Sequence, residues 1–266
     1  MNSINFPNWQ SSTPHPDTQL QINGQHGQVS KYEDYEIDPY LLKLIEGKTI
    51  AYVCPSPHLK DLGMGDFIDS HDIVIRVNQG FFPTEETWED YGKRTDILVN
   101  CLNINKIRAL SENPEYVQSL KYILGPMVSV WDKPKIDSFL ESTGIPYQNV
   151  SDGYLFKLFK EIGTTVNTGL TGIITLLNYP IKELYVTGMT FFNMNQMGKI
   201  YHDEYHDQAV KFGNFSNTDN REPSVPQLRM DIHEQQPQID YFRKAVAENY
   251  PDKLKLDDYL QENFVE

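Results

Sequence analysis

Three short apolar runs between residues 49 and 100 constrain the fold of this chain more than any other feature. The runs cover residues 49–54, 73–77 and 97–99, and each is followed at once by proline or asparagine. Apolar runs of this length with such boundaries are typical of strands buried on both faces of a parallel sheet. In an open α/β sheet, ligands bind outside the carboxyl ends of the strands. The sequence therefore predicts a ligand site at that edge of the sheet.

Helix-like segments separate these runs and continue the pattern along the chain. The expected helices cover residues 35–46, 84–91, 103–110, 114–120, 133–143, 169–177 and 237–249, and further strands cover residues 122–124 and 184–186. Strands that alternate with helices of this size predict a mostly parallel sheet with helices on both faces. Thr168 is expected to cap the helix that starts at Gly169, and the free N–H groups at that helix end form an anion site.

Two polar segments lie outside this regular pattern. Residues 1–30 are rich in Gln, Asn, Ser, Pro and His and show no apolar period. We expect them to form a flexible tail ahead of a single domain that spans residues 31–266. Residues 193–229 are polar and contain Gly198 and Gly213, and we expect an irregular, lid-like insertion there.

Charge and composition limit the classes of function. A formal charge of −14 argues against broad contact with nucleic acid, whose phosphates would be repelled. Two cysteines, Cys54 and Cys101, are too few for a disulfide framework and favour a reducing compartment. No stretch reaches the roughly 20 apolar residues that span a bilayer, and the N-terminus lacks the features of a signal peptide. We expect a cytoplasmic protein without a transmembrane segment. This expectation is compatible with peripheral contact with a membrane.

Polar residues gather just past the predicted strand ends. Ser56 and Pro57 follow the first run, Arg76 and Asn78 close the second, and Asn100 follows the third. An asparagine at a strand end carries a donor and an acceptor, so it can bind a base or a ribose. A small residue followed by glycine, as at Thr168, lets a phosphate or carboxylate approach backbone N–H groups.

The histidines are the remaining candidates for chemistry. His202 and His206 stand four apart, so a helix would place both on one face, as zinc ligands require. In the zincin motif a glutamate directly follows the first histidine, whereas Asp203 does so here. Metal-dependent hydrolysis through His202 and His206 is one hypothesis for this pair, and loss of activity in EDTA would support it. His233 precedes a predicted helix, where a neutral imidazole would serve as a general base.

The order of these motifs resembles that of the sialyltransferases. The segment IAYVCPSPHLKDLGMGDFIDSHDIVIRVNQG, followed by DYGKRT, resembles the large sialylmotif of eukaryotic glycosyltransferase family 29. The segment NTGLTGIITLLNYPIKELYVTGMTFF resembles the small sialylmotif and the matching NTG segment of the bacterial family 42 enzymes. The run HEQQPQIDYFRKAV resembles the segment that carries the catalytic histidine in both families.

The resemblance implies a Rossmann-like fold of the GT-A type and an inverting glycosyltransferase that needs neither a metal nor another cofactor. Such an enzyme moves sialic acid from CMP-sialic acid to a glycan hydroxyl. It implies that His233 deprotonates the acceptor, and that His202, with Tyr201 and Tyr205 as rivals, contacts the leaving phosphate. Together with the strand-end residues, it gives a donor-binding set of Ser56, Pro57, Arg76, Asn78, Asn100, Asn167, Thr168, Gly169, Gly188, Met189 and Thr190.

The chain departs from the family pattern at three points. Cys54 and Pro55 stand where the family has Gly-Asn, and Pro55 has no N–H to donate. The cysteines do not form the family's usual pair, and Gln238 stands where the eukaryotic enzymes carry glutamate. CMP-Kdo, another CMP-activated ulosonic acid, is therefore an alternative donor. Pro55 also motivates a second hypothesis, a catalytically weak or inactive nucleotide- or glycan-binding protein on the same fold.

Overall fold

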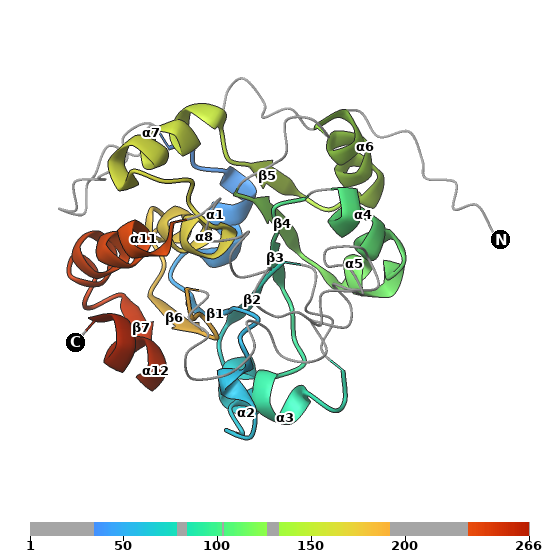
Figure 1. The fold of residues 1–266 in the computed structure, drawn as a ribbon. Coiled ribbons are helices and arrows are strands. Elements are labelled where there is room, and N and C mark those ends of the chain that lie inside the picture. The colour runs from blue at the N-terminus through green and yellow to red at the C-terminus, as the bar shows by residue number, and fades with distance from the viewer. Residues whose placement is uncertain (1–34, 79–83, 103, 127–132, 192–233, 266) are drawn as a thin grey trace, which may run out of the picture.

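The computed structural model describes residues 35–78, 84–102, 104–126, 133–191 and 234–265 (Figure 1). Within these ranges, seven strands form one sheet in the order β5-β4-β3-β2-β1-β6-β7, and every adjacent pair is parallel. The strands are β1 Thr49–Val53, β2 Ile73–Val77, β3 Ile97–Val99, β4 Tyr122–Gly125, β5 Tyr147–Asn149, β6 Glu183–Thr187 and β7 Leu254–Leu256. The predicted α/β class is confirmed, and all of these strand pairs are parallel.

Helices cover both faces of the sheet (Figure 1). One face is covered by α1 Pro39–Ile45, α7 Asp152–Ile162, α8 Thr168–Leu177 and α11 Gln235–Tyr241, the last continuing as a π-helical segment, Phe242–Ala247. The other face is covered by α2 Gly65–Asp69, α3 Trp88–Tyr91, α4 Ile104–Ser111, α5 Pro114–Ser119 and α6 Lys133–Thr143. A short helix, α12 Asp258–Leu260, follows β7.

The core is divided by the sheet because successive strand residues point to opposite faces. Val99 and Leu124 pack in the cluster that includes α8, whereas Leu98 and Ile123 pack against α4, α5 and α6. Strands with apolar residues on both faces need cover on both sides. This explains why the runs at β2 and β3 are continuously apolar except at Arg76.

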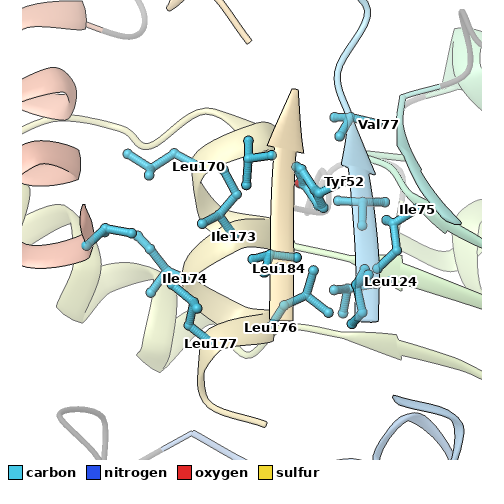
Figure 2. Close-up of a cluster of buried hydrophobic side chains, with 14 of the residues drawn as sticks. Tyr52, Ile75, Val77, Leu124, Leu170, Ile173, Ile174, Leu176, Leu177 and Leu184 are labelled. Carbon is cyan, nitrogen blue, oxygen red and sulfur yellow. The ribbon is translucent and has the colours of Figure 1, made fainter. Parts of the chain in front are cut away.

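Helix α8 is the most deeply buried helix among the described residues. All of its residues from Thr168 to Leu177 are buried, and Figure 2 shows its apolar side chains in the cluster beside the strands. The hydroxyl of Tyr52 in β1 donates to the carbonyl of Gly169 at 2.9 Å. A Cβ at Gly172 would overlap the same hydroxyl, so glycine permits the close approach of α8 to β1. The start of α8 is thereby fixed beside the end of β1.

The strand order reverses at β1. Strands β2 to β5 lie on one side of β1, and β6 and β7 lie on the other. The carboxyl ends of β1 and β6, which pair from Thr49↔Glu183 to Val53↔Thr187, therefore flank the topological switch point of the sheet. Open α/β sheets bind their ligands at this point.

Two details of the expected elements need correction. Asn167, and not Thr168, is the N-cap of α8, because its Oδ1 accepts a hydrogen bond from the N–H of Leu170 at 2.8 Å. The predicted helices 35–46 and 84–91 begin later than expected, at Pro39 and Trp88. Asp38 caps the first of these, and its Oδ1 accepts from the N–H of Leu41.

Candidate functional site

The loops that follow β1 and β6 are joined by backbone hydrogen bonds at the switch point. The N–H of Cys54 donates to the carbonyl of Thr187 at 2.9 Å, and the N–H of Ser56 donates to the carbonyl of Gly188 at 3.0 Å. Gly188 has φ +73°, and a Cβ there would overlap the carbonyl of Cys54. Only glycine allows the two loops to lie this close.

Other predicted donor-binding residues meet at the same place. A Cβ on Gly169, at the start of α8, would lie 3.6 Å from Sγ of Cys54 and 3.8 Å from Cε of Met189. Met189 and Thr190 directly follow Gly188, so the ends of β1, β6 and the start of α8 converge. The structure thus brings together Ser56, Gly169, Gly188 and Met189, which come from three separate parts of the chain.

A carboxylate from a fourth part of the chain fixes these loops. Oδ2 of Asp257, just after β7, accepts hydrogen bonds from the Thr187 hydroxyl at 2.6 Å and from the Gly188 N–H at 3.2 Å. The same oxygen lies 2.8 Å from Nε2 of His58. The other oxygen, Oδ1, accepts from the N–H of Leu260 and so caps α12. One side chain therefore ties together the loops after β1, β6 and β7.

His58 extends this network to Ser56. Its Nδ1 lies 3.0 Å from the Ser56 hydroxyl oxygen, while Nε2 faces Asp257. Because a carboxylate accepts hydrogen bonds, Nε2 is the protonated nitrogen. The ring also stacks on Tyr259 at 4.6 Å between centroids with an interplanar angle of 20°. The side chains of His58 and Asp257 are 5% and 9% exposed, so the pair is shielded from water.

The electrostatics of the site follow from Asp257. Burial raises the pKa of its carboxyl, but the hydrogen bonds and charge of His58 and the bonds from Thr187 and Leu260 outweigh this, and the pKa is below its ordinary value. The negative charge in turn adds to the effect of burial on Cys54, whose thiol pKa is strongly raised. A thiol held neutral in this way is a poor nucleophile. Both cysteines are free, as predicted, and Cys54 is buried.

The cap residue of α8 is itself held from α11. The N–H of Asn167 donates to Oε1 of Gln238 at 2.9 Å, and Nε2 of Gln238 donates to the carbonyl of Glu234 at 3.0 Å. Gln238 is fully buried, and Asn167 and Thr168 are each 7% exposed. The first N–H groups of an α-helix have no partner within the helix, so the fixed start of α8 can bind an anionic group.

Arg76, a residue of the predicted donor-binding set, holds its guanidinium against the segment that follows α3. Its guanidinium is fully buried and donates to the carbonyl of Tyr91 at 2.7 Å, the carbonyl of Arg94 at 2.9 Å and the hydroxyl of Thr95 at 3.1 Å. Burial lowers its pKa to about 10, so it remains charged. Arg76 fastens the Tyr91–Thr95 segment to β2. Pro57 starts the single 3-10 turn Pro57–Leu59, which presents His58 to Asp257.

Asn78 and Asn100 lie at the ends of the next two strands. The N–H of Asn78 donates to the carbonyl of Val99, and the N–H of Asn100 donates to the carbonyl of Leu124. Asn78 has φ +64°, a left-handed conformation that asparagine tolerates better than most residues. The amide oxygen of Asn100 accepts from the N–H of Leu102 at 2.8 Å. Both side chains are at the sheet edge where the sequence predicts the ligand.

The remaining predicted residues lie outside the described parts of the chain. These are Tyr201, His202, Tyr205 and His233, together with the expected tail at 1–30 and the lid-like segment at 193–229. In the part that the structure describes, no helix combines the length and apolar character needed to cross a bilayer. The same residues contain no cluster of three His, Cys, Asp or Glu side chains suited to a metal ion.

Three residues of the site, His58, Asp257 and Gln238, are not predicted by the sequence patterns, and Gln238 stands out only as a departure from the family pattern. The contact between His58 and Asp257 spans 199 positions, so no local pattern reveals it. Asp257 follows β7, a three-residue strand that the periodicity did not predict. A prediction of that strand would have placed Asp257 at the same sheet edge as the other candidates.

The fold and the site define a class, the doubly wound α/β proteins with polar residues at the switch point. Residues 46–144 match the model of glycosyltransferase family 29 (sialyltransferase). The sialyltransferase CstII from Campylobacter jejuni in complex with cytidine-5'-monophosphate is 17% identical, with a TM-score of 0.50 over 83% of this chain and 84% of that chain. A mammalian sialyltransferase is 20% identical over 66% of this chain and 71% of that one, with a TM-score of 0.39.

The family match confirms, for residues 46–144, the resemblance to the sialyltransferases that the motifs indicate. No curated protein matches it in sequence. The family match begins just after α1 and runs from β1 through β4 to α6, so it includes the loop that carries Ser56 and His58. At this level of identity, the likeness to CstII shows a common fold.

Proposed function

We propose that this protein is a glycosyltransferase that transfers sialic acid from CMP-sialic acid to a hydroxyl of a glycan. The observation that carries the proposal is the convergence of Ser56, Gly169 and Gly188 at the switch point of a sheet whose first four strands match the sialyltransferase family. The C. jejuni protein of similar fold was solved with cytidine-5'-monophosphate. A cytidine monophosphate at the switch point is therefore central to the proposal.

The leaving group determines what the site must do. Departure of CMP builds negative charge on its phosphate while the sugar gains oxocarbenium character. Hydrogen-bond donors that are already oriented stabilise such charge without reorganisation. The start of α8 supplies them, because the first N–H groups of a helix point out of its end, and Gly169 there lies beside Cys54 and Met189. The contacts of Asn167 with Gln238 keep this helix end in place.

The acceptor hydroxyl needs a base on the opposite side of the sugar carbon. His233 is proposed for this role on the basis of the family resemblance, and direct in-line attack would invert the anomeric centre. Such a reaction does not require a metal, because the donors and the imidazole provide the necessary charge stabilisation and proton transfer. His202, Tyr201 or Tyr205 would contact the leaving phosphate, as the same resemblance implies.

The donor sugar is to be chosen between sialic acid and Kdo. Pro55 stands beside the site and cannot donate a backbone hydrogen bond. CMP-Kdo is therefore a second donor to test. The same departure supports the second candidate function, a nucleotide- or glycan-binding protein with little or no turnover.

The experiment measures CMP release and sugar transfer by the full-length protein, with CMP-sialic acid and CMP-Kdo, in buffer with and without EDTA. We expect one donor to be turned over, at a rate that EDTA leaves unchanged. His233→Ala should lower transfer by about 10²–10⁴-fold and leave CMP affinity intact, as for loss of a general base. Tight CMP binding without release of CMP from either donor would favour the binding protein. Loss of activity in EDTA would favour metal-dependent chemistry.

A further inference from the structure

Three asparagines occupy one row across the carboxyl edge of the sheet. Asn149 ends β5 and pairs in register with Gly125 of β4. Asn100 follows β3 and donates its N–H to the carbonyl of Leu124, the residue before Gly125. Asn78 follows β2 and donates its N–H to the carbonyl of Val99, the residue before Asn100. The ladder therefore places Asn78, Asn100, Gly125 and Asn149 side by side on four adjacent strands.

Each of these asparagines has an amide atom without a hydrogen-bond partner in the described structure. The atoms are Oδ1 of Asn78, Nδ2 of Asn100 and Oδ1 of Asn149, and all three are buried. Asn100 as a whole is 0% exposed. Buried polar groups in proteins are nearly always paired, because an unpaired one destabilises the fold. Three such atoms in one row, at the edge where α/β sheets bind ligands, point to a bound group that pairs with them.

The chemistry of the row selects the kind of ligand. It offers two acceptors and one donor, and all three atoms are uncharged. A hydroxyl both donates and accepts, so a ring with several hydroxyls matches this set, whereas a phosphate could use only the donor. Arg76, the cation on β2 next to the row, directs its guanidinium to backbone carbonyls instead.

The row also has a direction. Neighbouring strands are spaced by about 4.8 Å, so Asn149 lies roughly 14 Å from Asn78 and roughly 19 Å from the end of β1. Asn78 is next to the switch point, and Asn149 is at the far end, on the outermost strand of the sheet on that side. A ligand along the row would extend away from the nucleotide position.

We propose that Asn78, Asn100 and Asn149 form a sugar subsite that binds the hydroxyl groups of a sugar ring. The proposal rests on the proposed function, because the ring would belong either to the donor or to the acceptor of the transfer reaction. Asn149 is the residue that this proposal adds, since neither its place in the chain nor any motif marks it.

The test compares the wild-type protein with Asn149→Ala in calorimetric titrations with three probes. The probes are CMP, the analogue CMP-3FNeuAc, and the disaccharide Gal-β-1-3GalNAc with CMP present and absent. Asn249→Ala is the matched control, because this exposed asparagine has its amide satisfied by the carbonyls of Lys244 and Ala245. We expect Asn149→Ala to bind CMP like the wild type and to bind one sugar-bearing probe at least tenfold more weakly.

The titrations with the three probes distinguish a donor subsite from an acceptor subsite. Weaker binding of the analogue alone assigns the row to the donor sugar, and weaker binding of the disaccharide assigns it to the acceptor. Equal binding of both by wild type and variant, or no binding of any sugar by the wild type, overturns the subsite. If the proposed function is wrong, the wild type will bind neither CMP nor its analogue. In that case, comparing disaccharide binding by the wild type and Asn149→Ala still tests the sugar subsite.

A structure of the wild-type protein soaked with CMP and the disaccharide covers the case in which Asn149→Ala does not fold. A sugar hydroxyl within about 3.2 Å of Oδ1 of Asn149 is expected. Ordered water alone at that atom, with sugar bound elsewhere or nowhere, overturns the proposal.

Discussion

Nε2 of His58 lies 2.8 Å from Oδ2 of Asp257, and this contact joins the segments that follow β1 and β7, the first and last described strands in chain order. His58 follows β1, and Asp257 follows β7. The same carboxylate oxygen accepts from Thr187 and Gly188 after β6, the strand that lies between the other two. Three strand ends at the switch point are thus held by one buried anion. The geometry of the proposed nucleotide site therefore depends on this anion.

Substitution Asp257→Asn should destabilise the protein and weaken CMP binding. The amide group of asparagine cannot accept all of the hydrogen bonds that the carboxylate accepts, and one of its two ends donates. We expect the free energy of unfolding to fall by about 1–3 kcal/mol, the cost of an unsatisfied buried group. Urea unfolding would measure it, with the exposed neighbour substitution Asp258→Asn as control. Equal unfolding midpoints for the two variants would contradict the structural role of Asp257.

The low pKa of Asp257 predicts a specific dependence of stability on pH. Because the pKa is lower in the folded than in the unfolded state, the carboxylate stabilises the fold fully above the ordinary Asp pKa of about 3.9. That contribution is lost as the pH falls through the folded-state pKa. The difference in unfolding free energy between wild type and Asp257→Asn should therefore be constant from pH 7 to 5 and shrink below pH 4. A difference that stays constant down to pH 3 would argue against the shift.

Replacing Arg76 should lower the stability of the fold and leave the affinity for CMP nearly unchanged. Lysine cannot reach the three acceptors that the guanidinium binds, so Arg76→Lys should lower the free energy of unfolding by roughly 2–4 kcal/mol. The affinity of the folded variant for CMP should stay within about threefold. Arg108→Lys is the control, because Arg108 is exposed and makes only a surface ion pair. A stable Arg76→Lys protein that no longer binds CMP would restore Arg76 to the donor site.

Gly188 should tolerate no side chain. An alanine there would have an unfavourable positive φ and would overlap the carbonyl of Cys54, so the loops after β1 and β6 would separate. We expect Gly188→Ala to lower the melting temperature and to reduce CMP affinity by at least tenfold. Gly153→Ala in α7 is the contrasting case, because a Cβ there meets nothing within 4 Å. That variant should be as stable as wild type or more so, and the reverse order would refute the argument.

The sequence predicts the bounds of a helix or strand well where the pattern of apolar residues alone determines that element. Strands β2 and β3 and helix α6 match their predicted bounds, because continuous apolar runs and a helical pattern leave little choice. The sequence does not predict strand β5, Tyr147–Asn149, because two of its three residues are amides and all three are only partly buried. Strand β7 was missed because a three-residue Leu-Lys-Leu run is too short to distinguish from a loop.

The site was predicted only in part, for a related reason. Ser56, Gly169 and Gly188 were found because they flank predicted strands and helices. The sequence does not reveal the register of Arg76, which pairs with Val53 and Leu98 within the sheet and has a fully buried side chain. The cap of α8 was misplaced by one residue because Asn167 and Thr168 are both good capping residues. Contacts between distant segments, such as His58 with Asp257, are set by tertiary packing alone.

The most direct test of the account is a crystal structure of the full-length protein soaked with CMP. We expect CMP at the switch point, with its phosphate beside the start of α8 and its nucleoside against Ser56, Gly188 and Met189. CMP bound at another edge of the sheet, or an empty switch point at saturating CMP, would contradict it.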